Sequence, residues 1–362
     1  MKKSLLALAA LTAFSGVASA QSSVTLFGVA DVNLRNVKNG STSLRSMSQD
    51  GIASSRLGIR GVEDLGGGLR GSFWFEGAIT PDNGTAGGQT WQRRSTVSLS
   101  GGFGEVRLGR DYTPTFWNHN VFDPFGTNGV GSQTNLMQEY GVASPVRASG
   151  ATTIVRANNS VGYFLPSGLG GIYGQVMVAA GEGVAGNKYI GGRVGYSAGP
   201  LNVAFAIGNT EVNSTRDLNA WNLAGSWNLG FMNLMGQYHS YKVDNTSGAD
   251  PKQTNLMIGA VVPMGASTFR ASYGRATINS GVSGSSDQKA SQFALGYQYD
   301  LSKRTAVYTN FSRVSNDTDT RFAVAGGGTA TASPNNGGSP AFGGTATKKG
   351  STGYEFGVRH TF

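Results

Sequence analysis

The dominant pattern along the chain is an alternation of bulky apolar residues with small or polar ones. Between residues 290 and 300, glutamine, alanine and glycine would lie on one face of an extended chain, and the other face would carry Phe293, Leu295, Tyr297 and Tyr299. Residues 201–208 and 221–229 alternate in the same sense. A period of two residues is typical of a β-strand whose two faces meet different surroundings. The pattern therefore predicts strands and not helices.

Segments of this kind recur through the chain, joined alternately by short turns and longer loops. Only every second residue of a transmembrane barrel strand faces lipid, so such a strand alternates in this way. An even number of strands, with short turns at one end of the barrel and longer loops at the other, is also typical of such a barrel. Sixteen strands enclose a lumen wide enough for water. We therefore predict an all-β fold, a 16-stranded antiparallel transmembrane β-barrel, with strands near residues 23–37, 51–64, 68–80, 91–101, 104–112, 151–164, 169–180, 188–197, 201–209, 219–229, 231–243, 253–263, 267–277, 290–300, 304–314 and 350–362.

Composition narrows the picture without changing it. The chain has 56 glycines, which disfavour helices, and no cysteine, which excludes a disulfide scaffold. Its mean hydropathy is −0.19, and no stretch after the first twenty residues resembles an apolar membrane helix. A barrel is compatible with that value because half of its strand residues face water. The net charge of +9 favours anionic partners or solutes, although a generally solvated cationic surface would explain it equally well.

The first twenty residues have the pattern of a secretory signal peptide. Lys2 and Lys3 precede a short apolar run, and Ala18-Ser19-Ala20 supplies a small-residue cleavage site. We therefore expect residues 1–20 to be removed, which would lower the net charge to +7, and residues 21–362 to form one barrel domain. Residues 113–150 are the longest loop between predicted strands, and a loop of that length is usually functional or disordered.

Several segments resemble, in order, the general trimeric porins of β-proteobacteria within the Gram-negative general porin family. They are Ser22–Asp31, Ser55–Gly68, Leu99–Gly104, Leu108–Tyr112, Asp123–Gly126, Arg156–Val161 and Gly357–Phe362. The resemblance implies a sixteen-stranded barrel, a homotrimer, and a third extracellular loop folded inward as a constriction. One departure is Thr127, which stands where a second glycine is usual after Phe125-Gly126.

The resemblance also implies the function. We expect an outer-membrane diffusion porin of a Gram-negative bacterium, a water-filled channel for passive transport of ions and small hydrophilic solutes. It would not be an enzyme, and it would need no cofactor. The expected partners are a homotrimer, outer-membrane lipid and lipopolysaccharide, the barrel-assembly machinery, and small ions and solutes; no nucleic acid is expected. The C-terminal Phe362 resembles the assembly signal read by that machinery.

Arginines are the candidate chemistry of the pore wall. Parity places most of them on the face opposite the apolar residues, whereas Arg110 breaks strict parity because Val106 and Leu108 should face lipid. The resemblance assigns Arg56, Arg110 and Arg147 to the wall of the constriction. A salt bridge or a lipopolysaccharide contact would be the alternative role of any one arginine. The full set of predicted wall residues is Arg35, Arg56, Arg60, Arg70, Arg94, Arg110 and Arg147.

The constriction loop carries few acidic residues, with Asp123 and Glu139 the ones available beyond Asp111. A ring with more guanidinium than carboxylate holds a positive potential, so we expect anion preference. The loop residues predicted to shape the site are Phe116, Trp117, Asp123, Pro124, Phe125, Gly126 and Glu139.

Other functions remain as alternatives. Phe116 and Trp117 could stack a ligand in a substrate-specific transport barrel, and a plugged barrel could act as an adhesin or an outer-membrane enzyme. A soluble sandwich alternates as well. Residues 181–186 match a dinucleotide motif and residues 195–199 a nucleophile-elbow motif, but strand patterns follow both where helices are needed. The three histidines, at positions 119, 239 and 360, have no metal-site spacing, so no metal site is predicted.

Overall fold

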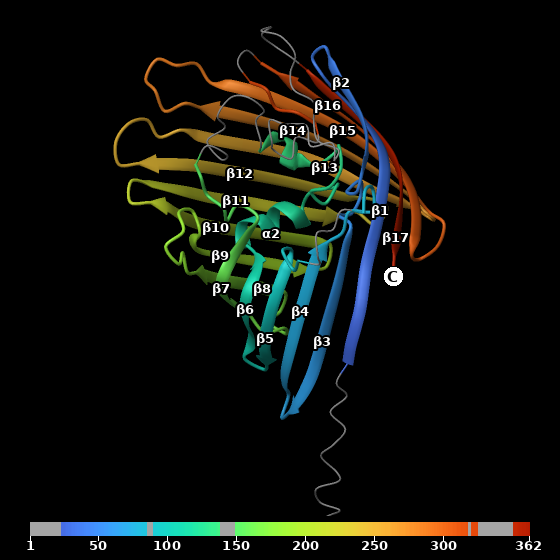
Figure 1. Cartoon of the computed structure of the whole chain (residues 1–362), viewed down its shortest axis with the longest axis vertical. Helices are drawn as coiled ribbons and strands as arrows, with labels where there is room; N and C mark the ends of the chain where they lie inside the picture. The colour runs from blue at the N-terminus through green and yellow to red at the C-terminus, as the bar shows by residue number, and fades with distance from the viewer. Residues whose placement is uncertain (1–22, 85–89, 138–148, 318–319, 325–349) are drawn as a thin grey trace, which may run out of the picture.

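The chain forms a closed antiparallel β-barrel (Figure 1). The computed structural model describes residues 23–84, 90–137, 149–317, 320–324 and 350–362. The predicted signal peptide therefore lies outside the described residues. The strands are β1 (Ser23–Asn39), β2 (Thr42–Ser48), β3 (Arg56–Gly66), β4 (Leu69–Ala78), β5 (Arg94–Gly101), β6 (Gly104–Tyr112), β7 (Arg156–Phe164), β8 (Ile172–Ala179), β9 (Lys188–Ala198), β10 (Leu201–Asn213), β11 (Arg216–Asn228), β12 (Asn233–Asn245), β13 (Lys252–Met264), β14 (Ser267–Asn279), β15 (Gln288–Asp300), β16 (Thr305–Asn316) and β17 (Ser351–Thr361).

Strands β2 and β3 share one position in the barrel wall, because both pair with the same edge of β1. Residues 33–39 of β1 pair with β2, and residues 23–29 of β1 pair with β3. The other edge of β1 pairs with β17, which closes the barrel. Since β2 and β3 together make one wall position, the predicted sixteen-stranded architecture is confirmed.

The alternation seen in the sequence separates the two faces of the wall. In β10, Phe205 and Ile207 are 39% and 54% exposed, whereas Ala204 and Ala206 between them are buried. In β17, Tyr354 and Phe356 are exposed on either side of the buried Glu355. Bulky apolar side chains therefore face outward, and small or polar side chains face the lumen, as expected of a barrel in lipid.

The structure corrects the predicted connections in two places. Residues 38–50 were expected to form a loop and 51–64 a strand, but β1 turns back at once into β2, and an irregular segment over 49–55 interrupts the wall before β3. Residues 210–218 were also expected to form a long loop, whereas only residues 214 and 215 separate β10 from β11. The two motifs set aside above lead into strands β9 and β10 and not into helices.

The described part of the long loop lies against the inner wall. It contains helix α2 (Pro114–Val121) and the 3-10 turn η1 (Gln133–Leu136). Helix α2 contacts β8–β11, and η1 contacts β14 and β15; Figure 1 shows α2 surrounded by strands. Pro114 suits the start of α2, where its missing N–H has no helical partner. No helix among the described residues is long and apolar enough to cross a membrane.

Candidate functional site

Neutral polar side chains of the inner wall hold the long loop. Asn118 of α2 donates to Asn222 Oδ1 at 2.9 Å, and Asn222 donates to the Thr115 carbonyl at 2.9 Å. Farther along the loop, Gln133 donates to Ser272 Oγ at 3.0 Å. Buried polar groups need such partners. The remaining wall amides satisfy loop carbonyls: Gln292 donates to Gly131 and Ser132, and Gln253 and Asn255 donate to Leu136.

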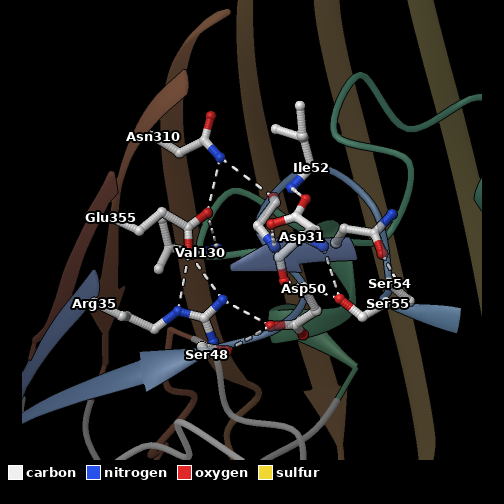
Figure 2. A network of polar contacts seen from close by, with 12 residues as sticks. Asp31, Arg35, Ser48, Asp50, Ile52, Ser54, Ser55, Val130, Asn310 and Glu355 are labelled. Atoms are coloured by element: carbon white, nitrogen blue, oxygen red, sulfur yellow. Dashed lines mark hydrogen bonds and ion pairs between the residues drawn. The ribbon is translucent and has the colours of Figure 1, made fainter. Parts of the chain in front are cut away.

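The tip of the loop is fastened by a buried charged network (Figure 2). Glu355 of β17 accepts a hydrogen bond from the Val130 backbone N–H at 3.2 Å and another from Asn310 Nδ2 at 2.8 Å. Arg35 Nε donates to Glu355 Oε2 at 2.9 Å, and Arg35 Nη2 donates to Asp50 Oδ1 at 2.8 Å. The predicted wall residue Arg35 therefore has its charge matched by two carboxylates and serves as an anchor.

A second inward segment, residues 49–55, is fixed by Asp31 of β1. The Asp31 carboxylate accepts hydrogen bonds from the backbone N–H groups of Gly51, Ile52 and Ala53 at 3.2, 2.9 and 2.9 Å. Ser54 Oγ then donates to Asn128 Oδ1 in the long loop at 2.8 Å. The two inward segments are thus joined to each other as well as to the wall. Figure 2 shows the contacts of Asp31 with the segment that contains Ile52.

The turn at residues 123–127 is organised by one carboxylate. Asp123 accepts from the backbone N–H groups of Phe125, Thr127 and Gln133 at 3.0, 3.1 and 3.1 Å. Burial nevertheless raises the pKa of Asp123 to about 6, against the lowering effect of these hydrogen bonds. Gly126 and Thr127 have φ of 58° and 61°. Thr127 therefore occupies a left-handed conformation that favours glycine.

The other predicted loop residues are packing elements. Phe116 is buried, with its ring 5.0 Å from that of Tyr112, and Trp117 meets the same ring edge-on at 5.4 Å. Phe125 is buried, and its ring covers Gly131 so closely that a Cβ there would lie 2.4 Å from it. Pro124 covers Gly259 of β13 in the same way. Glu139 lies outside the described residues.

Most of the predicted arginines lie on a different side of the barrel wall from the strands that hold the long loop. Apart from the contacts of Phe116 and Trp117 with Tyr112 of β6, the loop contacts described above lie on β8–β15 and β17, whereas a cluster of guanidinium groups lies on and beside β3–β7. We call the set on and beside these strands the arginine wall; it comprises Arg56, Arg60, Arg93, Arg94, Arg107 and Arg156.

Aromatic rings support several of these guanidinium groups. The indole ring of Trp74 has Arg60 at 5.0 Å and Arg94 at 4.6 Å from its centroid. Arg156 lies 4.4 Å from the Tyr112 ring centroid and donates to its hydroxyl at 3.0 Å. Such cation–π contacts orient a guanidinium group without cancelling its charge.

Carboxylates on the same wall are fewer. Glu76 pairs with Arg93 at 2.6 Å and lies 3.7 Å from Arg56. Arg107 pairs with Glu105 at 2.8 Å and with Asp111 at 2.5 Å. The six arginines of the arginine wall and the three carboxylates that pair with them together carry a formal charge of +3.

The structure places the remaining predicted arginines elsewhere. Arg70 is exposed and pairs in register with Asp64 beside the turn at residues 66–69, so it lies at the end of the barrel. Arg110 pairs in register with Ser95, on the same outward row as the exposed Leu108. It donates to the Gln92 carbonyl at 2.6 Å. Arg110 therefore follows strand parity, and the expectation that the chain would turn it inward is corrected. Arg147 lies outside the described residues.

Sequence reasoning missed three members of the arginine wall. Arg107 could have been found by parity, because it lies between the outward-facing Val106 and Leu108. Arg93 precedes β5 and has no strand parity to follow. Arg156 follows the register shift between β6 and β7, where the simple alternation breaks. Their clustering depends on the fold and not on local pattern.

Comparisons with known proteins agree with this geometry. A family model described as Gram-negative porin matches residues 7–319. The chain is 36% identical to outer membrane porin protein 32 of Delftia acidovorans over the full length of both, and 29% identical to an outer membrane porin of Bordetella pertussis over 87% of this chain and 95% of that one.

The structural comparison points to the same group of proteins. The solved anion-selective porin from Comamonas acidovorans superimposes with a TM-score of 0.79 and 34% sequence identity, covering 94% of this chain and all of that one. The barrel, its inward loop and the matches together lead to one conclusion: the chain belongs to the Gram-negative porin family and is an outer-membrane porin.

Proposed function

We propose that this general diffusion porin prefers anions, which pass along the arginine wall. The observation that carries the proposal is the excess of guanidinium groups over carboxylates on β3–β7, away from the loop contacts. Guanidinium groups stay charged at every physiological pH. A positive wall in a confined aqueous space raises the local concentration of anions and excludes cations.

The comparisons support the proposal without deciding it. The Comamonas structure bears the description anion-selective, and it is 34% identical to this chain over 94% of its length. That description belongs to the related protein. The residues of this chain that would give the same property are those of the arginine wall.

We further propose passive transport without a chemical reaction. The guanidinium groups of the wall are poor proton carriers at physiological pH, and Glu76, Glu105 and Asp111 are each engaged by arginine. A homotrimer is proposed as the assembled form, with outer-membrane lipid and lipopolysaccharide as surroundings. Phe362 is proposed as the signal for the assembly machinery. Its backbone N–H donates to the Gly28 carbonyl at 3.1 Å across the closing seam, which supports a role in closure.

Planar-bilayer recording of the purified porin in a potassium chloride gradient tests the selectivity. We expect stepwise conductance with a reversal potential that favours chloride. Stepwise conductance that favours potassium would keep the channel and contradict the proposed anion preference. A correctly folded barrel without conductance would contradict the channel itself and favour a plugged, non-transporting barrel.

A further inference from the structure

Two of the three histidines, which the sequence separates by 120 positions, meet where the long loop packs on the wall. His119 belongs to α2 and His239 to β12. His119 Nδ1 lies 3.1 Å from His239 Nε2, and the ring centroids are 4.6 Å apart in an edge-to-face arrangement. Both side chains are buried, at 3% exposure each. The sequence showed no metal-site spacing because the fold alone creates this contact.

A third polar atom, Gln237 Oε1, forms a small triangle with the two imidazole nitrogens. Gln237 Oε1 lies 3.1 Å from His119 Nδ1 and within hydrogen-bonding distance of His239 Nε2. All three sides of this triangle are therefore 3.1 Å or shorter. A triangle of that size has points about 2.0–2.1 Å from all three corners, which is the usual distance from zinc to an imidazole nitrogen.

Protons alone do not satisfy this triangle. The amide oxygen only accepts, and each neutral imidazole carries one proton on either of its nitrogens. If His119 Nδ1 and His239 Nε2 both carry protons, these two donors oppose each other. If either nitrogen lacks its proton, that nitrogen is an acceptor that opposes the acceptor Gln237 Oε1. A cation above the triangle would accept a lone pair from all three atoms at once. The other nitrogen of His119, Nε2, is buried without a hydrogen-bond partner among the described residues.

Surrounding residues orient the three atoms as outer partners of a metal site do. Gln237 Nε2 donates to the His119 carbonyl at 3.2 Å, which turns its oxygen toward the histidines. Tyr241 Oη lies 3.4 Å from His239 Nδ1, leaving Nε2 as the coordinating nitrogen.

The geometry points to a binding site for a divalent transition-metal ion, of the class that prefers imidazole, formed by His119, Gln237 and His239. Zn²⁺ and Cu²⁺ are the ions that suit two imidazoles and an oxygen. The ion would join α2 to β12 and so fasten the constriction loop to the wall. This inference is independent of the proposed anion preference, because the site lies on the loop-bearing wall.

The test is metal binding by the full-length folded porin, measured with Cu²⁺ by electron paramagnetic resonance and with Zn²⁺ by calorimetry. We expect one ion per chain, removable by EDTA, with a copper spectrum that shows coupling to two nitrogens. Because the site is buried, the same measurement is made after refolding in the presence of the ion. Each of the variants H119N and H239N should lose at least tenfold in affinity.

The third histidine supplies the matched control. His360 lies on β17 and is exposed, and H360N should bind the ion as the wild type does. Q237E places a carboxylate in the triangle and should tighten binding, which keeps the test valid even if a histidine variant folds poorly. Absence of binding after refolding with the ion would overturn the inference. So would binding that H360N abolishes and H119N and H239N leave intact.

Discussion

The two sides of the lumen treat charge in opposite ways. The side of the wall that holds the long loop does so with neutral groups: its amides donate to loop carbonyls at 2.6–3.2 Å. The wall charges described above that reach this loop belong to the Arg35–Glu355–Asp50 network. The arginine wall instead keeps an excess of charge. Burying an unpaired charge is costly, whereas a charge facing water is not. The long loop thus packs through neutral groups and one matched network, whereas the arginine wall faces the lumen with a charge excess that can act on solutes.

The largest expected effect comes from breaking the charged network under the loop. E355A would leave Arg35 with only Asp50 as its partner and the Val130 N–H without its acceptor. Removing one partner of a buried ion pair typically costs about 3–5 kcal/mol. We expect that loss in the free energy of unfolding, measured by urea titration of the folded barrel in detergent. A cost below about 1 kcal/mol, the value of a surface pair, would contradict the anchoring role.

The matched control for that change removes both charges. The double variant R35M/E355M replaces the pair with apolar groups of similar length, and such replacements are often neutral in stability. Asp50 is then left without Arg35, but its side chain is 44% exposed and can be solvated. We expect the double variant to be more stable than E355A.

Neutralising the arginine wall should remove selectivity and leave the barrel folded. A unit charge about 4 Å away changes the energy of an anion by about 1 kcal/mol in water. The triple variant R56Q/R94Q/R156Q should therefore lose several-fold in its chloride-to-potassium permeability ratio per arginine. Reversal potentials in a salt gradient measure this ratio. An unchanged ratio would place the anion path elsewhere.

The pH dependence of stability should report Asp123. Its pKa is raised to about 6 by burial, from 3.8 in the unfolded chain, so the folded state holds the proton more tightly. Stability from this group is therefore present below about pH 4 and is lost as the pH rises through 6. One unit of pKa is about 1.4 kcal/mol, which is the loss expected between pH 5 and pH 7. In D123N the free energy of unfolding should lack this change with pH, whatever the absolute stability of the variant. Equal pH dependence in D123N and the wild type would contradict the assignment of this change to Asp123.

The smallest effect is expected at Thr127. T127A and T127G both lose the hydroxyl that accepts from Asn120, but only glycine suits a φ of 61°. The left-handed conformation costs an L-residue about 1–2 kcal/mol, and glycine avoids this cost. Glycine also loses more conformational entropy on folding than alanine does, which offsets part of that advantage. T127G should therefore be more stable than T127A by about 1 kcal/mol or less in urea unfolding. The reverse order would show that the turn is not strained.

Strand periodicity predicted the barrel well because lipid outside and water inside impose opposite preferences on successive residues. The same rule predicts that Arg56, Arg60 and Arg94 share one side of the wall, and their role there is a proposal. It fails at residues 49–55, where Asp31 gathers three backbone N–H groups and draws the chain out of the wall. No local pattern marks such a contact.

The long loop was predictable as a loop, but the contacts that hold it were not. Its length indicated a functional or disordered loop, and the family resemblance implied an inward fold. The wall residues that hold it, such as Gln292 and Glu355, are dispersed over strands far away in sequence. The meeting of His119 and His239 is of the same kind. Long-range pairing of side chains depends on strand register, which one sequence does not reveal.

Anion selectivity should depend on the face of the barrel wall that an arginine occupies. R94Q removes a charge from the arginine wall, and R110Q removes the same charge from the outward register of the neighbouring strand. The most direct measurement is the reversal potential of these two variants and the wild type in one potassium chloride gradient. We expect R94Q to shift the reversal potential toward that of potassium and R110Q to leave it unchanged. A shift in R110Q equal to or larger than that in R94Q would contradict the account.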